Sequence, residues 1–224
     1  MTSLTAESSP RIAGSPRALV RFCSNAQKRL WGLRLGRLYG FGIGVSYAVL
    51  ALIGPASVGA AAQLWARALG AASWVAGIGA LSLATELAAR DAALGLTGLA
   101  RLRGVREHEL ERARTIAGAQ RLGMTVVVPG LMLALALLLR FRTLHGSLAA
   151  LALALLTFPY AALVAGTLAP LARACSAWLP GRGRLLLLAL VLGPWLLGSG
   201  IGLHVPSIPG ALAWLLEQVA RSFR

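Results

Sequence analysis

The chain has 224 residues, of which 57% are hydrophobic and only 13% are charged, and its mean hydropathy is +0.72. Because a soluble domain carries about 25% charged residues, this composition excludes an ordinary soluble globular protein. The formal net charge of +15 is compatible with nucleic-acid binding, but the basic residues are placed as membrane topology places them. We therefore expect an integral protein of the lipid bilayer with no nucleic-acid partner.

The first 37 residues precede the apolar part of the chain. Residues 1–16 are rich in Ser, Thr and Pro, which predicts a disordered tail, and they show no secretory signal peptide. From 17 to 37, apolar residues recur at three- and four-residue steps, and basic residues occupy the opposite face. This pattern predicts a basic amphipathic helix in the cytoplasmic interface of the membrane. The alternative is a basic flank that only orients the first span.

Long uncharged runs fill the remainder of the chain. A helix needs roughly 20 apolar residues to cross the hydrocarbon, so the runs predict about six transmembrane helices. The expected spans are 40–62, 68–88, 122–140, 146–171, 185–203 and 206–220. Pro206 and Pro209 interrupt the last run, which makes the sixth span short or re-entrant. The expected fold class is an all-α polytopic membrane helix bundle with a transmembrane domain over 38–220.

The basic residues divide unequally between the two sides of such a bundle. With the N-terminus in the cytoplasm and six crossings, 19 of the 22 Lys and Arg residues lie inside. The three outside are Arg67, Arg140 and Arg142. This positive-inside bias predicts that both termini and the loops 90–121 and 173–184 are cytoplasmic. Cys23 and Cys175 then face a reducing compartment and are expected to be structural thiols.

Two glycine pairs in the spans have the spacing of helix-packing residues. Gly40 and Gly44 lie in the first span, and Gly198 and Gly202 lie in the fifth. Small residues four apart allow two helix backbones to approach closely in lipid. Neither pair belongs to a dinucleotide-binding fingerprint, because the third glycine of that motif is missing.

The cytoplasmic loop 90–121 has the most informative pattern in the chain. Gly104 separates two helical pieces, and the second begins at about Arg106 with its acidic residues first and its basic residues last. That order suits the helix dipole. A solvated hairpin would explain these charges, but it would not explain the apolar residues of the loop, which are Leu99, Leu102, Val105 and Leu110. These side chains need a partner surface or a membrane face.

Enzyme classes are disfavoured by what the motifs lack. Ser199 does not have the glycine spacing of a nucleophile elbow, and no span contains paired carboxylates. The three histidines are scattered, and the chain has no Walker-type phosphate-binding sequence. We therefore expect no catalytic residue, no metal site and no cofactor. Active transport by this chain would take its energy from another subunit.

The loop resembles the inner loop of ABC-2 type permeases. The resemblance rests on 90–105 (RDAALGLTGLARLRGV), followed by Leu110 and the pair Ala113–Arg114. The positions that match an acidic residue, a glycine, spaced leucines, a turn and a final basic residue are Asp91, Gly95, Leu99, Leu102, Gly104, Leu110 and Arg114. The order of a basic interfacial helix, six spans and a proline-broken region before the last span is also similar.

This resemblance implies the membrane-spanning permease subunit of an ATP-driven exporter in a bacterial inner (plasma) membrane. Its implied partners are a cytoplasmic ATPase subunit and a second copy or a related permease. The implied ATPase-docking residues are Asp91, Leu99, Arg101, Leu102, Arg103, Gly104, Val105 and Arg106. The main alternative is a non-transporting membrane subunit that anchors or assembles a larger complex. A membrane enzyme is the third hypothesis.

Overall fold

A computed structural model describes residues 16–28, 30–54, 57–93, 95–179, 182–201 and 207–222, with the backbone alone at 85–93, 96, 99, 101 and 195–201. The described residues form helices and no strand, which confirms the all-α fold class. The helices are α1 (Pro16–Gln27), α2 (Trp31–Ile53), α3 (Val58–Ala93), α4 (Leu96–Leu102), α5 (Glu107–Arg140), α6 (Leu144–Trp178), α7 (Gly183–Ile201) and α8 (Ile208–Arg221).

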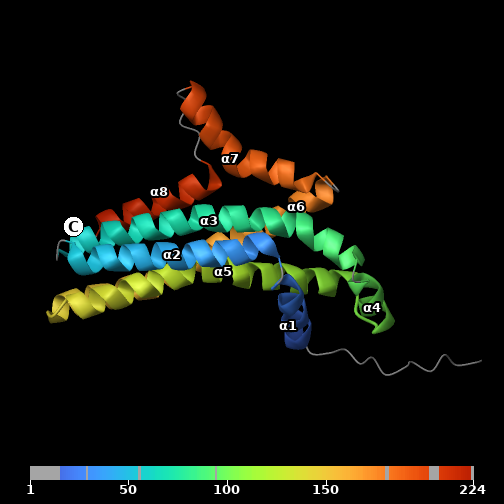
Figure 1. Cartoon of the computed structure of the whole chain (residues 1–224), viewed down its shortest axis with the longest axis horizontal. Helices are drawn as coiled ribbons and strands as arrows, with labels where there is room; N and C mark the ends of the chain where they lie inside the picture. Colours follow the sequence, from blue (N-terminus) through green and yellow to red (C-terminus); the bar gives the residue numbers. More distant parts are fainter. Residues whose placement is uncertain are drawn as a thin grey trace, which may run out of the picture.

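Helices α2, α3, α5 and α6 lie side by side and form a bundle (Figure 1). These are the four described helices that are long and apolar enough to cross a membrane, with α3 counted from Val58 to Ala84. The count in the described residues is therefore four, where about six spans were expected. Helix α3 is the most buried of the four and α2 the least, so α3 is the central helix and α2 a peripheral one.

Large apolar side chains cover the outside of the bundle. Ile53, Leu139 and Leu155 are 77%, 70% and 70% exposed, and many other leucines lie on the same surface. A water-soluble protein rarely exposes apolar surface on this scale, because contact of that surface with water is unfavourable. Hydrocarbon removes this cost. The chain is therefore a membrane protein with its leucine-rich faces towards lipid.

Alanine fills the centre of the bundle. Helix α3 alone contributes the buried residues Ala61, Ala62, Ala66, Ala68, Ala72, Ala76 and Ala80. Such small side chains let neighbouring helices approach closely. In lipid, where apolar burial gives little driving force, this close packing stabilises the association of helices.

Gly40 and Gly44 lie where α2 crosses α5. A Cβ on Gly40 would be 2.8 Å from the carbonyl oxygen of Thr125, and one on Gly44 would be 3.0 Å from the Cα of Pro129. A Cβ at Gly40 would clash with the backbone of α5 and one at Gly44 would be tightly crowded by it, so the two backbones lie close together. Gly198 lies in the part of α7 described by its backbone alone, and Gly202 lies outside the described residues.

Two polar pairs join α3 to α6 inside the bundle. The indole Nε1 of Trp65 donates to Oγ1 of Thr157 at 3.1 Å, and the hydroxyls of Ser73 and Tyr160 lie 2.7 Å apart. All four side chains are buried. A buried polar group without a partner costs free energy, most of all where water is absent. The pairs therefore satisfy the polar groups that they bury.

The N-terminal amphipathic region differs from the expected single helix over 17–37. Helix α1 ends at Gln27, and α2 begins at Trp31 after Leu30 in extended conformation. Figure 1 shows α1 at a steep angle to the bundle. Leu30 and Leu33 are both buried in the main core. The apolar residues Leu30 and Leu33 therefore face the same core, although the chain changes direction between α1 and α2.

The first expected span also ends earlier than residue 62. Helix α2 ends at Ile53, and Gly54 is extended, the conformation favoured before a proline. Helix α3 begins at Val58 rather than near 68. The apolar run Leu38–Ala66 therefore contains a turn between two helices, which hydropathy does not distinguish from a continuous span because both helices are apolar.

The C-terminal helix α8 packs on α3 in the opposite direction. A Cβ on Gly77 would lie 3.6 Å from Cγ of Pro209, and one on Gly70 would lie 3.2 Å from Cβ of Ala213. Helix α8 therefore starts halfway along α3 and ends at the far end of the bundle from α1 and α4 (Figure 1). Its 14 residues cover about 21 Å, less than the roughly 30 Å of a hydrocarbon core.

This geometry does not reproduce the expected sixth crossing, which would return the chain to the side of α1. Helix α7 leaves the bundle at an angle in Figure 1, and its described apolar part, Gly183–Pro194, is shorter than the four long helices. The sequence predicts a sixth helix that is short or re-entrant, and α8, with 14 residues, is short and does not complete a crossing. Gly70 and Gly77 of α3 instead allow the short helix α8 to pack closely against α3.

Candidate functional site

Helices α1, α4 and the start of α5 meet at one end of the bundle, which we call the α1–α4 end. They share a hydrophobic cluster that is separate from the main core. We call this cluster the end core; its buried members are Cys23, Ala100, Leu110, Ala113 and Ala117, with Leu19, Val20 and Val105 packed against it. The end core ties the amphipathic helix and the loop helix to the same segment of α5.

A tight turn connects α4 to α5 at this end. The backbone N–H groups of Arg103 and Val105 both donate to the carbonyl oxygen of Ala100, at 3.2 and 3.0 Å. Gly104 has a φ of +71°, the left-handed conformation that favours glycine at the end of a helix. A Cβ on Gly104 would meet nothing within 4 Å, so the backbone conformation and not lack of space requires glycine here.

The predicted docking residues divide into exposed and half-buried ones. The side chain of Leu102 is 85% exposed, and those of Arg103 and Arg106 are also exposed. Val105 is half-buried and packs against the end core, so it is less exposed than Leu102.

The other predicted docking residues are described less fully. Leu99 and Arg101 lie in α4 and Asp91 lies in α3, and for all three the structure describes the backbone alone. The turn therefore presents Leu102 between α4 and two exposed arginines, and the contribution of Leu99 and Arg101 to this surface falls outside the described side chains.

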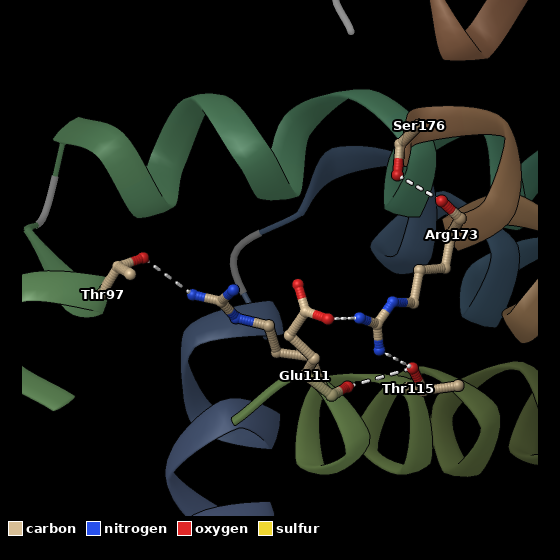
Figure 2. Close-up of polar contacts among 6 residues, drawn as sticks. Thr97, Glu111, Thr115, Arg173 and Ser176 are labelled. Carbon is tan, nitrogen blue, oxygen red and sulfur yellow. Dashed lines mark hydrogen bonds and ion pairs between the residues drawn. The ribbon is translucent and has the colours of Figure 1, made fainter. Parts of the chain in front are cut away.

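The first turns of α5 are fastened to the end of α6. Arg173 of α6 forms an ion pair with Glu111, and it donates from Nη1 to Oγ1 of Thr115 at 2.9 Å (Figure 2). Thr115 in turn donates to the carbonyl oxygen of Glu111, and Ser176 donates to that of Arg173 at 2.8 Å. This set links the loop to α6, which lies across the bundle from the turn's own helix α4.

A second polar contact holds α4 against α5. Nη2 of Arg114 donates to Oγ1 of Thr97 at 3.4 Å (Figure 2 shows Thr97 at this contact). Glu109 accepts a hydrogen bond from the N–H of Arg106, at 3.3 Å, at the start of α5. Both sides of the turn are therefore held by side chains of α5, and the exposed Leu102 projects from a supported segment.

Arg121 and Gln27 join α1 to α5 below the end core. Nη2 of Arg121 donates to the carbonyl oxygen and the hydroxyl of Ser24 at 2.6 and 3.0 Å, and Gln27 donates to the carbonyl oxygen of Arg114 at 3.0 Å. Arg121 is only 8% exposed. Nε of Arg121 and Oε1 of Gln27 have no partner in the part of the chain that the structure describes.

Sequence reasoning missed these partners for different reasons. Gln27 is a polar residue on the apolar stripe of α1, and this position in the pattern was the only sequence signal for its contact. In the structure its side chain is fully buried. Arg173 and Ser24 lie far along the chain from the α5 residues that they contact, so spacing in a single sequence contains no signal for either contact.

The α1–α4 end presents exposed apolar and basic side chains on a supported turn. In the described residues, no group of three His, Cys, Asp or Glu side chains gathers closely enough to hold a metal ion. Cys23 and Cys175 are both buried free thiols on different helices. Comparison of the chain with protein-family models, with curated proteins and with solved structures finds no match.

Proposed function

We propose that this chain is the membrane-spanning permease subunit of an ATP-driven exporter of the ABC-2 type. In this proposal the loop 90–121 docks a separate cytoplasmic ATPase, and two permease subunits, identical or related, form the path. The observation that supports docking most directly is the side chain of Leu102, which is 85% exposed beside Arg103 and Arg106 on a supported turn. The α1–α4 end then faces the cytoplasm of a bacterial cell, as its basic residues favour.

An exposed leucine flanked by cations is a suitable anchor for a partner. Buried apolar anchors dominate most protein interfaces, and charges at the rim add less. Leu102 supplies the anchor, and Arg103 and Arg106 supply a cationic rim. An acidic or neutral groove on the ATPase would complement this surface.

The supports of the turn suit a coupling element. A force on Leu102 reaches α5 through the end core and reaches α6 through Arg173 and Glu111. Helix α5 continues from this turn into the bundle without interruption to Arg140. Movement of the ATPase would therefore act on two of the four long helices.

A non-transporting anchor or assembly subunit is the second candidate. The close packing of the bundle favours it, because alanine and leucine fill the space among α3, α5 and α6. Transport by a permease with this interior needs a path at a subunit interface. The sparsely buried α2 is a face that a second subunit could cover.

Recovery of the ATPase from membranes tests the proposal. The tagged chain is expressed together with an ABC-type ATPase of the same genome, and the ATPase recovered with the wild type is compared with that recovered with Leu102→Asp. We expect Leu102→Asp to reduce recovery about tenfold or more, because it places a charge in an apolar pocket. The matched control is Trp178→Asp, which changes another exposed apolar residue at the same end, 82% exposed on α6.

Expression and membrane insertion of the three proteins are matched before the comparison. Equal recovery with the wild type and Leu102→Asp, or absence of any ATPase with the wild type, would overturn ATPase docking by this turn. The anchoring-subunit hypothesis would then lead.

A further inference from the structure

A cavity of about 660 Å³ lies between α1 and α5 at the α1–α4 end. Arg17, Arg21 and Lys28 line it from the side of α1, and all three side chains are exposed. Val20 and Ile116 line it with apolar atoms. The cavity therefore combines three cations with an apolar wall, which is the pattern of a site for an anionic amphiphile.

The positive charge at the cavity is not compensated by its own walls. None of the described side chains that line it is acidic. Arg121 does not line the cavity, but it donates hydrogen bonds to Ser24, a residue of the cavity wall. The acidic side chains described near this end, Glu107, Glu109 and Glu111, do not line the cavity, and Glu111 forms an ion pair with Arg173 on α6. Clustered guanidinium and ammonium groups of this kind bind phosphate oxygens.

An exposed stripe on α5, apolar except for Gln120 between Ile116 and Met124, leads from the cavity along the bundle surface. Ile116 is 39% exposed, and Met124, Leu131 and Leu135 follow on the same face with 56%, 39% and 60% of their surfaces exposed. Their spacing keeps them on one side of the helix. Met124 lies about 12 Å along the axis from Ile116, within the roughly 15 Å depth of one leaflet.

We propose that the α1–α5 cavity binds the phosphate headgroup of an anionic phospholipid, whose acyl chain lies along the exposed stripe of α5. The headgroup contacts Arg17, Arg21 and Lys28, and the acyl chain contacts Ile116 and Met124. The stripe favours a lipid over free phosphate, because its apolar side chains can contact an acyl chain, whereas a soluble anion gains nothing from them. This site does not depend on the proposed ATPase docking, since Leu102 and Arg103 are not part of it.

Lipid retention by the purified full-length chain tests the site. The protein in a neutral detergent is equilibrated with dioleoylphosphatidylglycerol or dioleoylphosphatidylcholine, and bound lipid is counted by native mass spectrometry. We expect the anionic lipid to be retained about tenfold better than the zwitterionic one. Replacing Arg17, Arg21 and Lys28 together by Gln should lower its retention about tenfold or more, since each basic residue near an anionic surface contributes about fivefold.

Three comparisons separate the site from general charge effects. The triple control replaces Arg142, Arg182 and Arg184 by Gln, removes the same charge from other exposed positions, and should change retention less than about twofold. Asn25→Trp fills the cavity without changing its charge and should lower retention as the site triple does. Met124→Gln, on the stripe, should lower retention of the lipid.

Each contrary result has a definite meaning for the proposal. Equal retention of the two lipids, an equal loss in the control triple, or full retention in Asn25→Trp would each overturn the site. Displacement of the lipid by excess inorganic phosphate, with Met124→Gln unchanged, would overturn the lipid assignment and identify a soluble phosphate as the ligand. Circular dichroism of every variant confirms that the helices remain folded.

Discussion

The middle of the bundle and its α1–α4 end handle polar groups in opposite ways. In the middle, Trp65 pairs with Thr157 and Ser73 pairs with Tyr160, and every partner is neutral and buried. At the α1–α4 end, the charged side chains of Arg121 and Arg173 reach across helices, and those of Arg103 and Arg106 are exposed.

The difference follows from what surrounds each region: hydrocarbon surrounds the middle of the bundle, and water and lipid headgroups surround the α1–α4 end. In hydrocarbon no water can satisfy a polar group, so a polar residue is tolerated only with its partner in place. At the interface, water and headgroups satisfy charges, so the chain can expose cations and keep them available for ligands. The middle of the bundle, which we call the closed region, stabilises the fold. The α1–α4 end, which we call the open region, carries both proposed binding surfaces.

The largest expected effect concerns the closed region, at the contact of α2 with α5. Gly40→Leu would force a side chain into a gap where a Cβ already meets the carbonyl oxygen of Thr125 at 2.8 Å. We expect it to lower the free energy of unfolding by about 3 kcal/mol, as severe overpacking does. Gly42→Leu is the control, because a Cβ on Gly42 meets nothing within 4 Å.

Reversible unfolding in detergent, followed by circular dichroism, measures both variants. The control should change the free energy of unfolding by no more than about 0.5 kcal/mol. Equal losses in the two variants would show that α2 does not pack on α5 through its glycines, and the contrast between a closed middle and an open end would then lack its main support.

A smaller effect is expected for the hydrogen bond between Trp65 and Thr157. A double-mutant cycle with Trp65→Phe and Thr157→Val should give a coupling energy of about 1 kcal/mol, near the upper part of the range for buried pairs in lipid. The control cycle combines Trp65→Phe with Thr167→Val. Among the described residues, the Thr167 hydroxyl bonds to carbonyl oxygens of its own helix, so this cycle should give no coupling energy. A coupling energy indistinguishable from zero would mean that the pair is merely tolerated.

The sequence predicts local features better than contacts between distant segments, and particular residues explain why. Hydropathy predicts a helical membrane bundle because every long helix is apolar on its outer face. The acid-first order after Arg106 predicts a helix start there, and α5 begins at Glu107. Local pattern is enough for these features, because each depends on neighbours within a few turns.

The remaining features depend on contacts between distant segments. Arg173 reaches Glu111 across 62 positions, and Arg121 reaches Ser24 across 97. The seat for α8 on Gly70 and Gly77 converts an apolar run into half a crossing. Val105 is half-buried because the end core exists only once α1 and α5 are assembled. Spacing along one chain does not specify such contacts.

The smallest expected effect concerns the pair of Arg173 and Glu111 at the open end. Their side chains are 36% and 41% exposed, so water and salt weaken their attraction. Glu111→Gln should therefore leave global stability almost unchanged, but it should loosen the start of α5 and the turn before it. We expect amide hydrogen exchange over 102–112 to become about twofold faster at low salt, which corresponds to about 0.5 kcal/mol, and this difference should fade as salt rises.

Glu217→Gln removes the same charge from an exposed position on α8 and should leave that exchange unchanged. The coupling between Trp65 and Thr157, by contrast, should not respond to salt, because its partners are neutral and buried. If salt altered both pairs equally, the middle of the bundle would be as accessible to water as its end, and the two regions would not differ in solvent.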